Sequence, residues 1–243
     1  MTFNRIVDRK FDALNPRTAM RHLPAGQISL AHARILYAFS AAGFVTAAFF
    51  LNRICFFLSP VALAVICFYS LTKRFTDYTH VFLGIALALA PVGAWLAVTG
   101  GFTLLPLEQT FFIPLLLALA VVFWLVGFDI IYALQDYQFD RTHGLHSLVV
   151  AWGPQNALRA AFLSHMVMWG VLAGFGLLCR FRMAYFVGLL IILACLLMEH
   201  WLARRRSLNW VNTAFFKLNA LISAVFLVVT LVEVIFPGFR FVR

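Results

Sequence analysis

An uncharged apolar run, TFFIPLLLALAVVFWLVGF at 110–128, leads directly into an acidic segment, DIIYALQDYQFD at 129–140. The apolar run is close to the roughly 20 residues that a helix needs to cross a bilayer. The acidic segment that follows therefore begins where this helix would leave the hydrocarbon core. Polar groups at such a position favour a functional site at the membrane edge.

Similar apolar runs fill most of the chain. Hydrophobic residues make up 63% of the 243 residues and charged residues only 12%, and the mean hydropathy is +0.93. A soluble domain of this size would not carry that balance. The sequence therefore predicts an all-α polytopic membrane protein that lies in a lipid bilayer. Seven spans are predicted, at 31–51, 54–72, 81–99, 110–128, 157–178, 183–202 and 213–236.

Lys and Arg are divided unequally between the two sides that these spans define. The N-terminal segment and the loops at 73–80, 129–156 and 203–212 fall on one side, which holds fourteen of the nineteen basic residues when nearby span ends are included. Because Lys and Arg are enriched in cytoplasmic loops, we expect this side to face the cytoplasm. The net charge of +10 is scattered rather than gathered into a basic stripe, so nucleic acid is not an expected partner.

One acidic pattern occurs twice, as DRKFD at 8–12 and as DYQFD at 136–140. Acids four positions apart share one face of a helix, where they repel each other unless a cation lies between them. Asn4 extends the first stripe and Tyr132 extends the second. Acids at solvated helix ends that interact with nearby Arg or with the helix dipole would also give such pairs. Two matching pairs on one side of a membrane protein favour oxygen ligands for divalent cations that hold a diphosphate.

Basic residues accompany both acid pairs. Arg17 and Arg21 follow the first pair, Arg141 follows the second, and Lys73 and Arg74 occupy a loop on the same side. Such cations suit phosphate oxygens, which Arg can bind in bidentate fashion, although the excess of positive charge in cytoplasmic loops explains Lys73 and Arg74 equally well. The nearby histidines lack the spacing of a zinc site, and we expect surface or supporting roles for His22, His143 and His146.

Three motifs along the chain carry a resemblance to a known family. They are NRIVDRKFD at 4–12 with NPRT at 15–18 and RHLPAG at 21–26, then YSLTKRFT at 69–76, and finally DIIYALQD at 129–136 with Asp140 and GLHS at 144–147. In this order they resemble the signatures of the UbiA family of intramembrane aromatic prenyltransferases. Within that family the sequence is similar to the 4-hydroxybenzoate polyprenyltransferases and to their relatives in menaquinone pathways.

The resemblance implies a Mg²⁺-dependent prenyltransferase of quinone biosynthesis in a bacterial inner membrane. A polyprenyl group would pass from an allylic polyprenyl diphosphate to an aromatic acid, most simply 4-hydroxybenzoate, and the new C–C bond would form ortho to the hydroxyl. Mg²⁺ prefers oxygen ligands and substrate phosphates, and its implied ligands are Asn4, Asp8 and Asp12 for one ion and Asp136 and Asp140 for another. The implied diphosphate-binding residues are Arg21, Lys73, Arg74, Arg141 and Tyr132. We expect Lys73 and Arg74 to act as catalytic residues that neutralise the leaving group, and Asp129 to orient the acceptor or to accept a proton.

Two features depart from the family pattern. Arg5 follows Asn4, where the family usually has Asn-Asp, so one carboxylate is missing from the first motif. The chain has seven predicted spans against about nine in the family. We therefore expect residues 1–243 to form a single transmembrane prenyltransferase domain that lacks its N-terminal helices, with motif segments near 1–30, 73–80 and 129–156 and with Met1 as an internal methionine.

Other functions remain open at this point. The acceptor could be a naphthoate-type menaquinone precursor, or the shortened chain could be an inactive fragment. A cation or proton transporter would place its acids near the bilayer midplane on broken helices, whereas these acids lie at span ends. A CDP-alcohol phosphotransferase would carry its acids in one compact block rather than in two distant ones.

Overall fold

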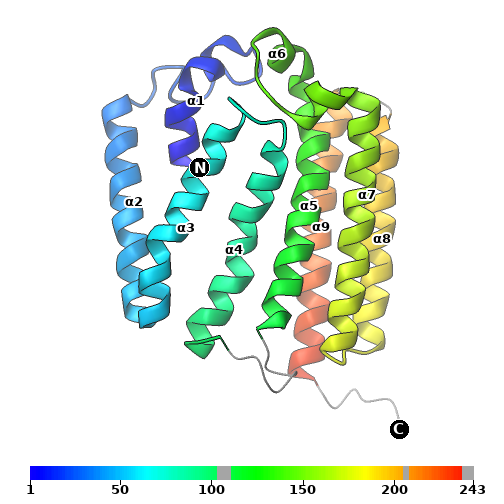
Figure 1. Ribbon diagram of the computed structural model, residues 1–243. Helices are drawn as coiled ribbons and strands as arrows, with labels where there is room; N and C mark the ends of the chain where they lie inside the picture. The colour runs from blue at the N-terminus through cyan, green and yellow to red at the C-terminus, as the bar shows by residue number, and fades with distance from the viewer. Residues whose placement is uncertain (103–110, 205–207, 237–243) are drawn as a thin grey trace.

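Long apolar helices run side by side across the protein, and short helices gather at one end of them (Figure 1). The computed structural model describes residues 1–102, 111–204 and 208–236. The long helices are α2 (Leu30–Leu51), α3 (Arg53–Thr72), α4 (Thr79–Thr99), α5 (Phe112–Ala133), α7 (Leu148–Leu178), α8 (Met183–Arg204) and α9 (Leu208–Ile235). The short elements are α1 (Thr2–Leu14), the 3₁₀ turn η2 (Leu134–Asp136) and α6 (Tyr137–Thr142).

Seven helices in the described part of the chain are long and apolar enough to cross a membrane. This confirms the predicted all-α class and the predicted number of spans. Residue 110 of the fourth predicted span and residues 205–207 of the 203–212 loop lie outside the described residues.

The largest error in the predicted boundaries concerns α7. The span predicted at 157–178 begins at Leu148, so the end of the predicted 129–156 loop is helical. The Ser147 hydroxyl accepts a hydrogen bond from the Val150 amide and caps this start. The helix bends at Gly153, whose φ of 77° lies in the left-handed region, and Pro154 follows. These two residues produce a kink within one helix rather than an end of it.

The packed core lies among α5, α7, α8 and α9. Half of the span in α8 is buried inside the protein, against 6% of the span in α2. On α2 and α3, large side chains such as Phe39, Phe50 and Phe57 are exposed, as expected for helices that face lipid. The α2–α4 side of the bundle is thus the thinner half, and α1 packs against α2 and α3 there.

A buried chain of polar groups joins the four core helices. The backbone carbonyl of Trp124 can only accept, so the Nε2 of His165 donates to it at 3.2 Å, and the Nδ1 of His165 then accepts from the Nε2 of His200 at 2.9 Å. The indole of Trp124 donates to Asn219 at 2.9 Å, and Asn219 donates to Glu199 at 3.2 Å. These bonds fix α5, α7, α8 and α9 relative to one another.

Candidate active site

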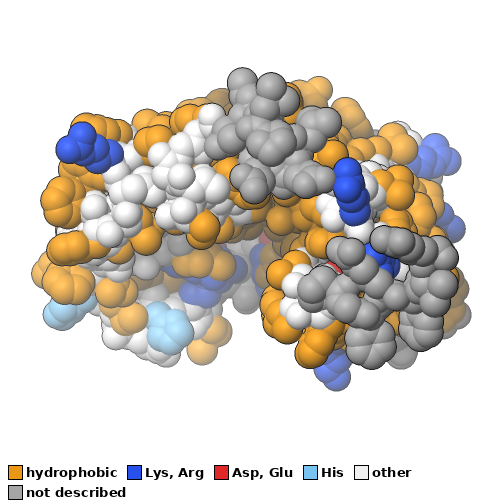
Figure 2. Space-filling view, turned by 90° about the horizontal axis from the view of Figure 1, so that it is seen from below, with side chains coloured by type: hydrophobic (Ala, Val, Ile, Leu, Met, Phe, Trp, Pro, Cys, Tyr) orange, Lys and Arg blue, Asp and Glu red, His pale blue; other side chains and the backbone are white. Residues whose placement is uncertain are grey.

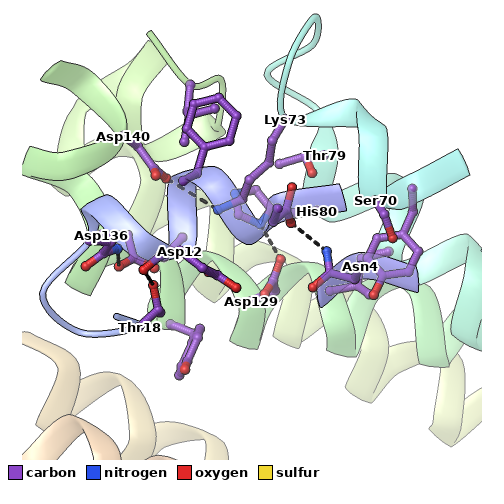
Figure 3. Close-up of a pocket in the computed structure, with 18 of the residues that line it drawn as sticks. Asn4, Asp12, Thr18, Ser70, Lys73, Thr79, His80, Asp129, Asp136 and Asp140 are labelled. Atoms are coloured by element: carbon purple, nitrogen blue, oxygen red, sulfur yellow. Dashed lines mark hydrogen bonds and ion pairs between the residues drawn. The ribbon is translucent and has the colours of Figure 1, made fainter. Parts of the chain in front are cut away.

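A cavity of about 490 Å³ lies at the end of the bundle that carries α1 and α6. Its walls come from α1, α3, α4, α5, η2 and α6, from the segments next to them, and from Phe216 of α9. Figure 3 shows Asp12, Asp136 and Asp140 around this space, and Asp8 also lines the cavity. Figure 2, seen from the opposite end, shows a largely hydrophobic face that is hollowed near its middle, with Lys or Arg side chains visible in the depth of the hollow.

The first acid pair lies on α1, as predicted from its spacing. Asn4, Asp8 and Asp12 follow one another at intervals of four and share one stripe of this helix. The Asn4 amide donates to Asp8 at 2.8 Å, and the Arg74 guanidinium lies 3.3 Å from the other Asp8 oxygen. Arg21 donates to Asp12 at 2.6 Å. The N-terminal stripe is therefore held from two other segments of the chain.

The oxygens of this stripe are only partly satisfied. The Oδ2 atom of Asp12 is buried and has no hydrogen-bond partner among the described residues, although Arg5 lies 3.7 Å from it. Burial raises the pKa of the Asp8 carboxyl, and the repulsion of Asp12 adds to this, while Arg74 opposes it without cancelling it. The position where the family usually has a carboxylate thus carries a cation, Arg5, which lines the cavity.

The second acid pair is positioned differently from the prediction. Tyr132, Asp136 and Asp140 were expected on one continuous helical stripe, but α5 ends at Ala133 and the chain tightens into η2 before α6 begins. A 3₁₀ turn has three residues per turn, which changes the direction of the side chains that follow it. Both acids are nevertheless buried and line the cavity.

Asp136 receives the densest set of hydrogen bonds at the site. The Asn15 amide donates to it at 2.9 Å, and the Arg17 guanidinium donates to both of its oxygens, through Nε at 2.9 Å and through a second nitrogen. Arg17 also donates to the Tyr132 hydroxyl at 2.7 Å and lies over the Tyr132 ring. The segment after α1 is thereby joined to the segment after α5.

The loop between α3 and α4 supplies the cation for the remaining acid. The Nζ atom of Lys73 lies 3.4 Å from Asp140. The His146 amide donates to the Lys73 carbonyl at 2.8 Å, and the His146 ring lies 2.9 Å from Asp77. These bonds hold the loop against the second motif and give His146 a supporting role.

The cations of the site remain charged because they face several acids. Burial lowers the pKa of Lys73, but Asp140, Asp129 and Asp136 raise it more, so its pKa lies above its ordinary value. Burial also opposes the charge of Arg17, and its hydrogen bonds to Asp136 outweigh that effect and raise its pKa. The site is therefore a network of charges rather than a set of bare carboxylates.

Each acid of the two motifs is paired with a cation from a different segment. The pairs are Asp8 with Arg74, Asp12 with Arg21, Asp136 with Arg17, and Asp140 with Lys73. Within the described residues, no three His, Cys, Asp or Glu side chains are close enough together to form a metal site by themselves. A divalent ion at either pair would therefore complete its shell with oxygens from a ligand or from water.

The predicted residues are not all brought together. Asn4, Asp8, Asp12, Arg21, Lys73, Arg74, Asp129, Tyr132, Asp136 and Asp140 line the cavity. Arg141 lies outside this lining, and its guanidinium is 3.4 Å from the Tyr137 hydroxyl instead.

Asn15 and His80 line the cavity but were not predicted as ligands or catalytic groups. Arg17 was expected only as a cation for phosphate oxygens, and its pairing with Asp136 was not predicted. The Asn-Pro-Arg sequence that ends α1 was the available signal for Asn15 and Arg17. His80 follows the Lys73–Arg74 loop with nothing in the sequence to distinguish it from a structural histidine.

Comparison with known proteins agrees with this geometry. Residues 1–221 match the UbiA prenyltransferase family. The chain belongs to this family. The prediction from the three motifs is thus confirmed, and the protein is an integral membrane protein of the UbiA type.

Curated relatives within the UbiA family are about 30% identical to this chain over the aligned residues. A 4-hydroxybenzoate octaprenyltransferase from Tolumonas auensis is 30% identical over 216 residues, which cover 89% of this chain and 72% of the relative. One from Pseudomonas syringae pv. tomato is 31% identical over 212 residues, which cover 87% of this chain and 69% of the relative.

Solved UbiA structures share the fold. A UbiA homolog from Aeropyrum pernix K1 in its apo form gives a TM-score of 0.86 at 30% identity, covering 96% of this chain and 84% of that one. A UbiA homolog from Archaeoglobus fulgidus, solved with DMAPP and Mg²⁺, gives a TM-score of 0.65 at 25% identity, covering 94% of this chain and 81% of that one.

Proposed function

We propose that this protein transfers a polyprenyl group from an allylic polyprenyl diphosphate to an aromatic acid, 4-hydroxybenzoate, for quinone biosynthesis. The observation that carries the proposal is the convergence of both acid pairs and their four cations on one cavity. The names of the curated relatives support the reaction and its acceptor. We place the protein in a bacterial inner membrane with this cavity facing the cytoplasm, because the basic loops lie on that side.

The donor atoms at the cavity suit Mg²⁺. They are carboxylate and amide oxygens, the ligands that hard divalent cations prefer. The buried Oδ2 of Asp12, which has no hydrogen-bond partner in the described part of the chain, is an oxygen that a cation would satisfy. Asn4, Asp8 and Asp12 would hold one ion, and Asp136 and Asp140 a second. Bound Mg²⁺ would neutralise the diphosphate and so make it a better leaving group.

In this proposal the basic side chains of the cavity have two roles: they pair with the acids, and they bind the diphosphate of the substrate. Each cation now neutralises an acid, at 2.6 Å for Arg21 and at 3.3–3.4 Å for Arg74 and Lys73. If the acids held metal ions instead, the same cations would be available to bind the phosphate oxygens of the substrate. Arg17 and Tyr132, joined at 2.7 Å, would hold the diphosphate from the side of α5. We leave Arg141 out of this set because of its position.

The deeper wall of the cavity suits the reacting carbon and its chain. Leu83 and Leu87 on α4 and Phe128 on α5 line it. These apolar groups would receive the first isoprene units while the diphosphate stays among the cations. The allylic C–O bond then breaks with its electron pair leaving on the diphosphate. The ring carbon ortho to the phenol hydroxyl forms the new C–C bond, and one proton is lost from the ring.

The test is an assay of membranes that contain the full chain, with Mg²⁺, a labelled polyprenyl diphosphate and either 4-hydroxybenzoate or a naphthoate acceptor. Asp8→Ala and Asp136→Ala should each reduce product by about 100-fold or more, because groups that stabilise developing charge contribute on that scale. Gln138→Ala is the matched control: it changes an exposed side chain of the second motif that lies outside the cavity lining, and it should keep most of the activity. Full activity in both alanine variants would overturn the two-pair site. Product with the naphthoate alone would reassign the acceptor.

A further inference from the structure

A histidine and an aspartate form a close pair in the wall of the cavity, apart from the metal-binding acids. The Nδ1 atom of His80, in the first turn of α4, lies 2.6 Å from the Oδ2 of Asp129 on α5 (Figure 3). An ionised carboxylate can only accept, so the ring N–H donates to it. Both residues line the cavity, and the pair joins two helices that form its wall.

The two members of the pair differ in their access to a ligand. The His80 side chain is completely enclosed, whereas the side chain of Asp129 is 23% exposed. The Nε2 atom of His80 is buried and has no hydrogen-bond partner among the described residues. A bound molecule can therefore touch the carboxylate but not the imidazole. In this arrangement Asp129 is the group that can react with a ligand, and the enclosed His80 orients its carboxylate.

The position of Asp129 matches the place of an acceptor ring. It precedes Asp136 by seven residues, and the chain between them follows the last turn of α5 and then η2. At about 1.5 Å per residue in the α-helix and about 2.0 Å in the 3₁₀ turn, the two positions are roughly 12 Å apart along the chain axis. We therefore place the acceptor ring between a diphosphate held at Asp136 and the carboxylate of Asp129. The positive charge of Lys73, in the wall of the same cavity, interacts with both Asp129 and Asp136.

We propose that Asp129 is the general base that accepts the phenolic proton of the acceptor, and that His80 is the positioning residue that holds this carboxylate. The inference rests on the proposed function and assigns the acceptor side of the same site. As the allylic carbon leaves the diphosphate and bonds to the ortho carbon, Asp129 removes the O–H proton and a dienone forms. Loss of the ortho hydrogen as a proton and return of a proton to the oxygen restore the phenol, so one proton is released per turnover.

The proposal limits the class of acceptor. It requires a hydroxyl on the ring directed toward Asp129, because a proton on oxygen is what the carboxylate can take. Aromatic acids whose hydroxyl is methylated should bind in the cavity and give no product.

The experiment uses the full chain and a series of 4-hydroxybenzoates whose ring substituents lower the phenol pKa stepwise. Asp129→Asn should reduce turnover of the parent acceptor by about 10²–10⁴-fold, the usual range for general base catalysis. The ratio of wild-type to variant turnover should shrink as the phenol becomes more acidic, because an acceptor that is already ionised needs no base. If Asp129 had a purely structural role, this ratio would be the same for every acceptor. A constant ratio would therefore overturn the proposal.

Variants of His80 test the positioning role. His80→Leu removes the donor and should reduce turnover with the same dependence on phenol pKa, while the binding of the polyprenyl diphosphate stays unchanged. His80→Asn places an amide near the position of Nδ1 and should restore part of the turnover. His32→Asn, at an exposed histidine on α2 outside the cavity lining, is the control and should behave as the wild type.

Different experimental results would overturn the proposed function and the assignment of Asp129 and His80. If wild-type membranes with Mg²⁺ release no diphosphate from the allylic substrate, the proposed function falls and this inference falls with it. If the wild type forms product and Asp129→Asn forms it equally fast, only the assignment of Asp129 and His80 is overturned.

Discussion

At the scale of single residues, the site is organised by contacts between positions far apart in the sequence. Asp136 accepts hydrogen bonds from Asn15 and Arg17, which precede it by more than a hundred positions. The acids themselves were predictable, because carboxylates are rare in this chain and are spaced four apart. Their partners were not, because nothing in local spacing states which Arg will reach which Asp.

The prediction for single residues concerns the effect of Arg17 on the stability of the protein. Arg17→Ala leaves the nearly buried Asp136 carboxylate without its bidentate partner, and we expect a loss of about 1–3 kcal/mol in the free energy of unfolding, the range for hydrogen bonds to charged groups. Arg17→Lys keeps the charge but loses the fork, so its loss should be smaller. Unfolding in mixed detergent micelles measures both. Lys10→Ala, at an exposed position on α1, is the control, and an equal loss in that variant would contradict the assignment.

At the scale of elements, the positions of the membrane helices were predicted from the sequence, whereas two irregularities in these helices were not. The apolar runs formed helices where expected, since a bilayer requires every backbone group to be bonded within its own segment. Two irregularities were not expected. The 3₁₀ turn η2 interrupts the helix that carries Asp136, and the kink at Gly153 extends α7 through a predicted loop. Hydrophobic periodicity describes neither of them, because it does not report local changes in backbone conformation.

A close approach between α5 and α7 shows why one glycine is needed. A Cβ atom added at Gly127 would lie 2.2 Å from the ring of His165, the histidine that bonds to Trp124 and His200. The small residue lets the imidazole reach the α5 backbone, as small residues do between membrane helices.

Substituting this glycine gives the prediction for elements. Gly127→Ala should destabilise the bundle by about 1–3 kcal/mol, since overpacking of a filled core costs that much. Gly43→Ala on α2, where an added Cβ meets nothing within 4 Å, should be neutral or slightly stabilising. In combination with His165→Ala, the cost of Gly127→Ala should largely disappear, because the two positions are in contact. Additive losses in the double variant would show that the ring is not what excludes the methyl group.

At the scale of the whole molecule, the described structure has the arrangement that the charge pattern predicts. The segments that carry the two acid pairs lie at the same end of the bundle (Figure 1). The Lys and Arg residues assigned to the opposite side include Arg53, Arg180 and Arg182 at the other helix ends. Arg240 and Arg243, assigned to that side as well, lie outside the described residues, as do Arg205 and Arg206 of the 203–212 loop.

Orientation in the membrane is the prediction at this scale. In a chain whose four native cysteines are replaced, Arg182→Cys should react with an impermeant maleimide in intact cells, and Arg141→Cys should react only in inverted vesicles. The physical reason is the retention of Lys and Arg on the cytoplasmic side. Labelling of Arg141→Cys in intact cells would reverse the proposed orientation and place the cavity on the outer side.

The sequence by itself determined the class of this protein and the residue types of its site. Apolar length specified membrane helices, charge asymmetry specified their sides, and the two D-x-x-F-D segments supplied the acids, because each of these properties is local or additive along the chain. Tertiary structure alone decided which cation neutralises which acid, how η2 directs Asp136, and that His80 supports Asp129. Those features arise from contacts between segments that only folding brings within a few ångströms of one another.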